Sequence, residues 1–181
     1  MYTLPSTKTF VELNLDQKSE CLAHLFEPCQ TLANLLIQNV FNRNYQSYND
    51  FIESCRAFLL LFLEKEQSKR EVLPDIAQII SAHPRLGPSK DKLSSHSSSE
   101  QKSLAGSQEE SQKLASLNAL YEETFPGLRY VVFVNGRSRE TIMENMRSRI
   151  ERGDIQLERK EAFNAMCDIA IDRAEKLESK L

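Results

Sequence analysis

The chain has 181 residues, a formal net charge of −3 at pH 7 and a sequence pI of about 5.7. This length fits one domain with a single hydrophobic core, and the acidic balance without a basic window argues against a nucleic-acid partner. No apolar run approaches the ~20 residues that span a bilayer, and the N-terminus lacks a secretory signal pattern, so we expect a soluble protein without membrane insertion that is not secreted.

Helical periodicity dominates the sequence. Apolar residues recur every three or four positions over residues 51–62, 114–125 and 163–177, which predicts three amphipathic helices. Shorter helices are predicted over residues 30–40, from Pro74 to about residue 82, and over residues 142–150. The four cysteines, at positions 21, 29, 55 and 167, form no Cys-x-x-Cys pair, which is typical of a reducing compartment.

The helix predicted for residues 74–82 is followed by His83 and Pro84. Proline disfavours the helical conformation of the residue before it, so we expect His83 to leave the helix and project from its end. An imidazole at such an edge is suited to proton transfer. The sequence therefore singles out His83 as a candidate catalytic residue.

Residues 87–107 are rich in serine and lysine, a composition typical of a flexible surface loop. Within it, Ser97-x-x-Glu100 and Ser107-x-x-Glu110 both have the spacing of a capping box, in which a serine begins a helix. This spacing alone favours a helix-start role for Glu100 over a catalytic one. Glu100 and Gln101 also offer a carboxylate and a carboxamide that could orient an imidazole and hold a hydrogen-bonding substrate.

Residues 129–134 read Arg-Tyr-Val-Val-Phe-Val and are followed by Asn135-Gly136, a composition typical of a strand with a turn behind it. No second strand is evident, so we predict a buried extended segment near residues 129–135. Its main-chain groups then need other partners, and a ligand is one of them.

Metal-dependent and nucleophilic chemistry have little support. The three histidines are not spaced as a ligand pair, the cysteines do not cluster, and we expect no metal site. A nucleophile elbow and a glycine-rich phosphate loop are also missing from the sequence, which has five glycines. Acid–base chemistry without a cofactor remains, with His24 and His96 interpreted as structural residues.

The last three residues, Ser179, Lys180 and Leu181, match the peroxisomal targeting tripeptide. We therefore expect the peroxisomal import receptor as a partner and the peroxisome as the location.

Four motifs occur in a fixed order along the chain: His83-Pro84-x-Leu86-Gly87, Leu93-Ser94-x-x-Ser97-x-x-Glu100-Gln101, Leu117-Asn118-x-x-Tyr121-x-x-x-Phe125, and Tyr130-Val131-Val132-Phe133-Val134-Asn135-Gly136-Arg137-Ser138. Together they resemble the 2-oxo-4-hydroxy-4-carboxy-5-ureidoimidazoline (OHCU) decarboxylases of urate degradation, and fungal members most of all. The resemblance extends from about residue 26 to residue 173. It implies an all-α, single-domain compact helical bundle over residues 1–181, and conversion of OHCU to (S)-allantoin and CO₂ without a metal or organic cofactor.

The resemblance also assigns the site residues. His83 takes the place of the catalytic proton donor, with Glu100 as a second catalytic group. The implied substrate-binding residues are Pro84, Ser97, Ser98, Ser99, Glu100, Gln101, Tyr130, Val131, Val132, Phe133, Val134 and Arg173. An imidazole with its ordinary pKa of about 6.5 would supply at neutral pH the proton that must be added after the carboxylate is lost.

Several roles stay open at this stage. Glu100 could hold the His83 ring or accept hydrogen bonds from the ureido group. Arg173 lies in the apolar stripe of the last helix, where its partner could be the substrate carboxylate or Glu100, or its head could reach water. Arg137 is interpreted as a structural residue or as a charge at the rim of the site.

The sequence departs from the family pattern in two places. Arg85 stands where many members have an aspartate, with a shorter stretch before Glu100, and residues 26–29 lack the usual histidine, second proline and tryptophan. Two alternatives therefore remain: a decarboxylase or hydrolase of another ureide-like compound, and a non-catalytic helical binding protein. Relatives are often dimers, and apolar helix faces would serve such a contact.

Overall fold

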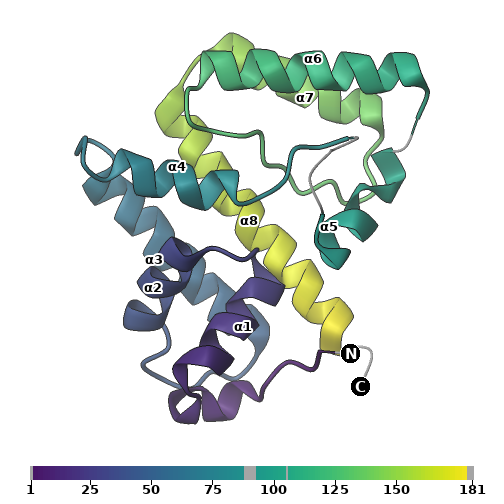
Figure 1. Cartoon of the computed structure of the whole chain (residues 1–181). Coiled ribbons are helices and arrows are strands. Elements are labelled where there is room, and N and C mark those ends of the chain that lie inside the picture. The colour runs from purple at the N-terminus through teal and green to yellow at the C-terminus, as the bar shows by residue number, and fades with distance from the viewer. Residues whose placement is uncertain (1, 88–92, 105, 179–181) are drawn as a thin grey trace.

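The computed structural model describes residues 2–87, 93–104 and 106–178, and all regular structure in these ranges is helical (Figure 1). In chain order the elements are η1 (Thr7–Glu12), α1 (Leu15–Leu25), α2 (Gln30–Asn39), α3 (Tyr48–Glu66), α4 (Leu73–Ser81), α5 (Ser95–Glu100), η2 (Gln101–Leu104), α6 (Gln108–Thr124), α7 (Arg139–Arg152) and α8 (Ile155–Glu178). The predicted all-α fold is confirmed. The targeting tripeptide at residues 179–181 lies outside the described residues.

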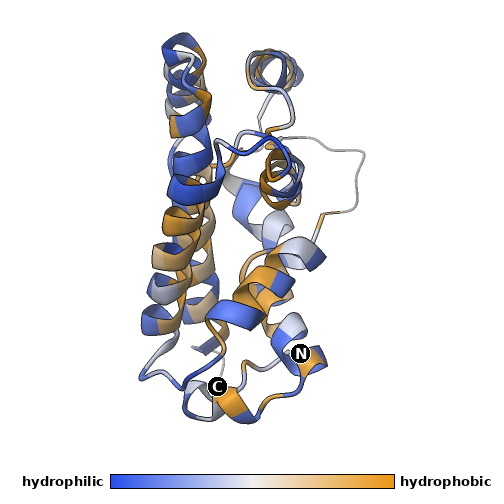
Figure 2. Ribbon diagram, turned by 90° about the vertical axis from the view of Figure 1, so that its left-hand side faces the viewer, coloured by the Kyte–Doolittle hydropathy of each residue, from blue (hydrophilic) through white to orange (hydrophobic). Residues whose placement is uncertain are grey.

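Helix α8 is the central element of the fold. It runs through the molecule from the α6–α7 end to the α1 end and packs most extensively on α3, with further contacts to α1 and α4 (Figure 1). Its buried face carries Phe163, Met166 and Ala170 in the predicted stripe, and in Figure 2 hydrophobic residues line the long helices over their middle turns. Because one helix touches both halves of the bundle, a side chain on α8 can join segments that are far apart in sequence.

Most helix starts follow the sequence prediction. Pro74 lies in the first turn of α4, and Ser107 and Glu110 form a capping box at the start of α6. The capping role predicted for Ser97 and Glu100 is wrong, because α5 begins one turn earlier with Ser94 as its N-cap. Glu100 is instead the last residue of α5. The flexible loop predicted for residues 87–107 thus contains α5 and η2, whereas residues 88–92 and 105 lie outside the described part of the chain.

The extended segment predicted near residues 129–135 is confirmed, and it pairs with no strand in the described part of the chain. Two arginine side chains donate hydrogen bonds to its carbonyl oxygens. Arg149 of α7 donates to the Val131 oxygen at 3.1 Å, and Arg137 donates to the oxygens of Phe133 and Val134. Arg137 is therefore a structural residue. Side-chain hydrogen bonds therefore satisfy the carbonyl groups that a neighbouring strand would otherwise satisfy.

No helix in the described ranges has both the length and the apolar character required to cross a membrane.

Candidate active site

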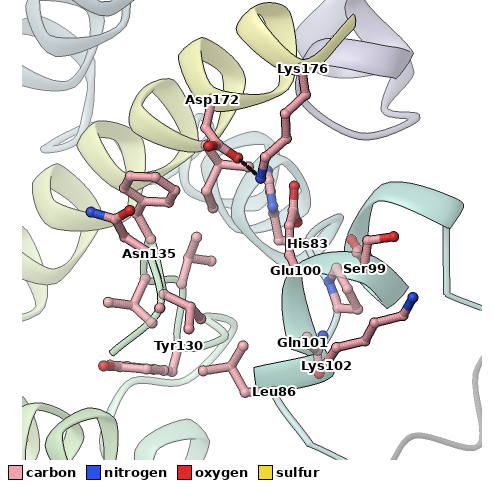
Figure 3. A pocket seen from close by; sticks show the side chains of 18 residues that line it. His83, Leu86, Ser99, Glu100, Gln101, Lys102, Tyr130, Asn135, Asp172 and Lys176 are labelled. Carbon is pink, nitrogen blue, oxygen red and sulfur yellow. Dashed lines mark hydrogen bonds and ion pairs between the residues drawn. The ribbon is translucent and has the colours of Figure 1, made fainter. Parts of the chain in front are cut away.

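A pocket of about 360 Å³ opens where four parts of the chain meet (Figure 3). The turn after α4, the α5–η2 region, the extended segment and one face of α8 each contribute part of its wall. Among the predicted binding residues, Pro84, Ser97, Ser99, Glu100, Gln101 and Tyr130 to Val134 line this pocket, together with His83. Ser98 is exposed and Arg173 lies behind the wall, and neither is among the described residues that line it. The pocket is also lined by seven residues that were not predicted to bind substrate: Leu86, Lys102, Asn135, Gly136, Ile169, Asp172 and Lys176.

His83 is buried at the wall of this pocket, with 4% of its surface exposed. Its Nε2 atom has no hydrogen-bond partner among the described residues. An unsatisfied buried polar atom costs about 1–3 kcal/mol, so its presence beside a pocket calls for an explanation other than stability. A bound ligand is the natural partner for this nitrogen.

The charge state of His83 differs from the sequence expectation. Burial lowers the pKa of His83 to about 3, and the positive charge of Arg173 adds to the shift. The expected pKa near 6.5 is therefore wrong, because a cationic imidazole would lose its hydration at this buried position. His83 is neutral in the free protein at neutral pH.

Arg173 reaches from α8 into a buried network of charged groups. Its Nε and Nη2 atoms donate to the two Glu100 oxygens at 2.6 and 2.9 Å, and Nη2 also lies 2.9 Å from Glu27 Oε1. Its Nη1 atom donates to the Phe26 oxygen at 2.6 Å. Although burial opposes the charge, the hydrogen bonds and the attraction of Glu100 and Glu27 raise the pKa of Arg173. Of the three predicted surroundings for Arg173, Glu100 is the observed partner, and the guanidinium is not in water.

Glu27 is the member of this network that sequence analysis did not identify. Its Oε1 atom accepts hydrogen bonds from Ser97 Oγ at 2.5 Å and from Ser94 Oγ at 3.2 Å. It thereby ties the turn after α1 to α5 and, through Arg173, to α8. The only signal in the sequence is a carboxylate directly before Pro28, and that signal does not reveal its partners.

The network also limits the role of Glu100. Both Glu100 oxygens accept from Arg173, and the described residues contain no hydrogen bond between Glu100 and the His83 ring. Glu100 lines the pocket beside His83 (Figure 3), and its position there is fixed by Arg173.

Gln101 shapes the turn that follows His83. Its Oε1 atom accepts from the Gly87 amide at 2.8 Å, and its Nε2 atom donates to the Arg85 oxygen at 3.1 Å. Gly87 has a φ of +91°, and a Cβ there would come within 2.9 Å of a Leu114 side-chain carbon, so this position requires glycine. Gln101 therefore sets the pocket wall around His83, in addition to lining the pocket itself.

Arg85, which departs from the family pattern, anchors the same turn from outside. Its Nε atom donates to Glu122 of α6 at 2.7 Å. The Leu86 oxygen next to it accepts from Asn118 Nδ2 at 3.0 Å, again from α6. The turn after His83 is thus fixed on α6 by two residues and on η2 by Gln101.

In the described part of the chain, the extended segment beside the pocket has main-chain amides without a hydrogen-bond partner. Its carbonyl groups at Val131, Phe133 and Val134 accept from Arg149 and Arg137, but within the described residues the main-chain N–H groups of residues 131–134 have no hydrogen-bond partner. Residues 130–136 line the pocket, with apolar side chains at residues 131–134 and these unpartnered main-chain amides along the same stretch. Such a wall suits a flat ligand that carries carbonyl oxygens.

These features define a class of protein. The all-α domain encloses a small-molecule pocket that combines a neutral buried histidine, a fixed carboxylate and free main-chain amides, which is the equipment of an acid–base enzyme. Within the ranges that the structure describes, no three histidine, cysteine, aspartate or glutamate side chains are grouped so as to hold a metal ion.

The family is shown by comparison with known proteins. The OHCU decarboxylase family model matches residues 12–175, and the chain belongs to this family. It is therefore a carboxy-lyase that decarboxylates OHCU in urate degradation. No curated protein matches the chain.

Proposed function

We propose that the pocket around His83 converts OHCU to (S)-allantoin and CO₂, with His83 moving the proton that reaches carbon. The observation that carries this assignment is the buried, unpartnered Nε2 atom of His83 at the pocket wall. The pocket volume of about 360 Å³ suits a single small ring with its ureido group.

A neutral imidazole can act in two steps. When the bond to the carboxylate breaks, CO₂ leaves and its electron pair stays in the ring. The 4-hydroxyl then gives up its proton as it becomes a carbonyl, and a ring carbon gains a proton. His83 takes the hydroxyl proton as a base and returns it to carbon as an acid, while the one further proton that the overall reaction consumes comes from water. The low pKa of His83 fits this sequence, because the residue must begin neutral.

The pocket wall favours protonation from one side. The apolar side chains and free amides of residues 131–134 would hold the ring flat on one face, opposite the α5–η2 wall with Glu100 and Gln101. Because His83 would then meet the ring from a fixed direction, the product should be a single enantiomer. Spontaneous decay of OHCU in water has no such preference and yields racemic allantoin.

Circular dichroism of the product tests this proposal. Freshly generated OHCU is incubated with and without the purified protein, and the optical activity of allantoin is followed in time. We expect faster formation of optically active (S)-allantoin with the protein. A racemic product formed at the background rate by folded protein would contradict the proposal and favour another ureide-like substrate.

We further propose that the protein acts in the peroxisome. The support is the sequence Ser179-Lys180-Leu181, which is the tripeptide read by the import receptor. Deleting these three residues should leave the decarboxylation rate unchanged and move a fluorescent fusion, tagged at the N-terminus, to the cytosol. Continued peroxisomal import of the truncated fusion would show that the signal lies elsewhere or that a partner carries the protein in.

The homodimer implied by the family resemblance stays a prediction. The groove that α3 and the start of α8 form on the surface supports it, since Leu60, Leu61 and Leu157 line this groove beside polar residues such as Glu64 and Lys160, and Leu61 is 47% exposed.

A further inference from the structure

A ureide ligand brings several N–H groups into the pocket, and each needs an acceptor there. OHCU and allantoin, the substrate and product of the proposed function, both carry a ureido group with an N–H and an NH₂ group as donors. The extended segment can supply few acceptors, because three of its main-chain oxygens, at Val131, Phe133 and Val134, already accept hydrogen bonds from arginine side chains. An N–H group buried without a partner weakens binding, so the acceptors for the ureido group are to be sought on the other walls.

Two carboxylate side chains are found among the described residues that line the pocket, Glu100 and Asp172. Both Glu100 oxygens accept hydrogen bonds from Arg173. The Oδ2 atom of Asp172 accepts from the Lys176 ammonium, whereas its Oδ1 atom has no hydrogen-bond partner in the described part of the chain. The Asp172 side chain is 24% exposed. Asp172 therefore presents a charged acceptor atom that the protein itself does not occupy.

Helix α8 places Asp172 at the same end of the pocket as His83. Ile169, Asp172 and Lys176 lie three and four residues apart, so they share one face of the helix, and all three line the pocket. Figure 3 shows the Asp172 side chain extending from α8 at the end of the pocket where His83 and Glu100 lie. A ring bound beside His83 can therefore reach Asp172 with a side group.

We propose that Asp172 accepts hydrogen bonds from the ureido group of the substrate and so determines specificity for a ring that carries this group, a step that rests on the proposed function. A carboxylate oxygen has two lone pairs, and the N–H and NH₂ groups of a ureido group can point to the same side, so one oxygen can accept from both. Such charge-assisted hydrogen bonds are stronger than those between neutral groups. The ion pair with Lys176 compensates the charge of Asp172, which limits its repulsion of the OHCU carboxylate.

The chemistry predicts how this contact divides between binding and rate. No bond within the ureido group forms or breaks as CO₂ leaves and the ring carbon gains its proton. The hydrogen bond to Asp172 should therefore be about equally strong in the substrate complex and in the transition state, and such an interaction lowers KM without raising kcat. A purely structural role for Asp172 would lower stability, or would weaken binding of ring ligands with and without a ureido group alike.

Asp172→Ala tests the proposal, with Glu109→Ala as the matched control. Glu109 forms the same kind of i,i+4 ion pair, with Lys113 on α6, and is not among the described residues that line the pocket. We expect KM for OHCU to rise about tenfold in Asp172→Ala, a change of about 1.4 kcal/mol, with kcat within about threefold of the wild-type value. Asp172→Asn should lose less, because its carbonyl oxygen still accepts a hydrogen bond, and Glu109→Ala should match the wild type in both constants.

A pair of ligands separates ureido recognition from general binding. Hydantoin has the same ring as (S)-allantoin but lacks the ureido group. In calorimetric titrations the wild-type protein should bind (S)-allantoin more tightly than hydantoin. Asp172→Ala should bind (S)-allantoin about tenfold more weakly, with an unchanged Kd for hydantoin, which also shows that the variant is folded. An unchanged KM for OHCU, or an equal loss of affinity for both ligands, would overturn the proposal.

These outcomes also distinguish the two proposals. Wild-type protein without activity on OHCU, but with an Asp172-dependent preference for (S)-allantoin over hydantoin, would overturn the proposed function and leave the ureido site in place. Active wild-type protein with an unaffected Asp172→Ala variant would overturn only the ureido site.

Discussion

Replacing His83 with asparagine should lower kcat for OHCU by about 10²–10⁴-fold, the range typical of losing an acid–base group. Asparagine keeps a similar size and can fill the same buried position, but it can neither accept the hydroxyl proton nor return one to carbon. The rate is measured by the optical activity of the product, so that spontaneous decay to racemic allantoin does not count. The residual product from His83→Asn should approach the racemic mixture of the uncatalysed reaction.

The pH dependence provides the second measurement on His83. In the free protein the pKa of His83 is lowered to about 3, so the neutral form is fully present at all pH values well above 3. Since kcat/KM reports on the free enzyme, we expect no inflection of one proton near pH 6.5, and a decline only as the pH falls toward 3. A wild-type-like rate for His83→Asn, or a loss of kcat/KM centred near pH 6.5 as the pH rises, would contradict a neutral His83 that works first as a base.

The lowered pKa of His83 also makes the free energy of unfolding depend on pH. The unfolded chain binds a proton at His83 below about pH 6.5, whereas the folded chain does not until the pH is near 3. The free energy of unfolding therefore decreases as the pH falls through this window. His83→Asn removes this contribution, so its stability should depend less on pH between these two values.

The helices could be predicted from the sequence because their periodicity is decided locally. In α3, α6 and α8 an apolar side chain recurs on one face at each turn, and that face is the buried one. The start of α5 could not be predicted in the same way, because a run of serines offers several equivalent caps. Ser94, and not Ser97, begins the helix, since burial of the Ser97 hydroxyl against Glu27 fixes the register.

The site could be predicted only in part. The order of motifs located His83, Gln101 and the segment at 130–134, all of which line one pocket. The partners of Arg173 depend on tertiary packing, since Glu27 lies 146 positions away in the sequence. The charge state of His83 could not be predicted either. It depends on burial and on the nearby Arg173 guanidinium, which a single sequence does not reveal.

Replacing Arg173 with methionine should lower the free energy of unfolding by about 3–5 kcal/mol, the usual effect of removing one partner from a buried ion pair. Methionine fills a similar volume, but it leaves the Glu27 and Glu100 carboxylates together without a cation and the Phe26 oxygen without its donor. The change is measured by urea unfolding of both proteins. Lys69→Met is the control, because Lys69 pairs with Glu66 at the surface, where water screens the pair, and its loss should change the free energy of unfolding far less.

A combined variant separates the charge effect from the loss of packing. If the cost in Arg173→Met comes from two carboxylates that repel each other in a buried site, the further change Glu27→Gln should restore part of the stability. Arg173→Met should also lower activity, because Glu100 then lacks the guanidinium that holds it beside His83. The added Glu27→Gln change should not restore that activity. A loss below about 1 kcal/mol in Arg173→Met would instead mean that water reaches both carboxylates, and α5 would then have to be held in place by contacts other than this network.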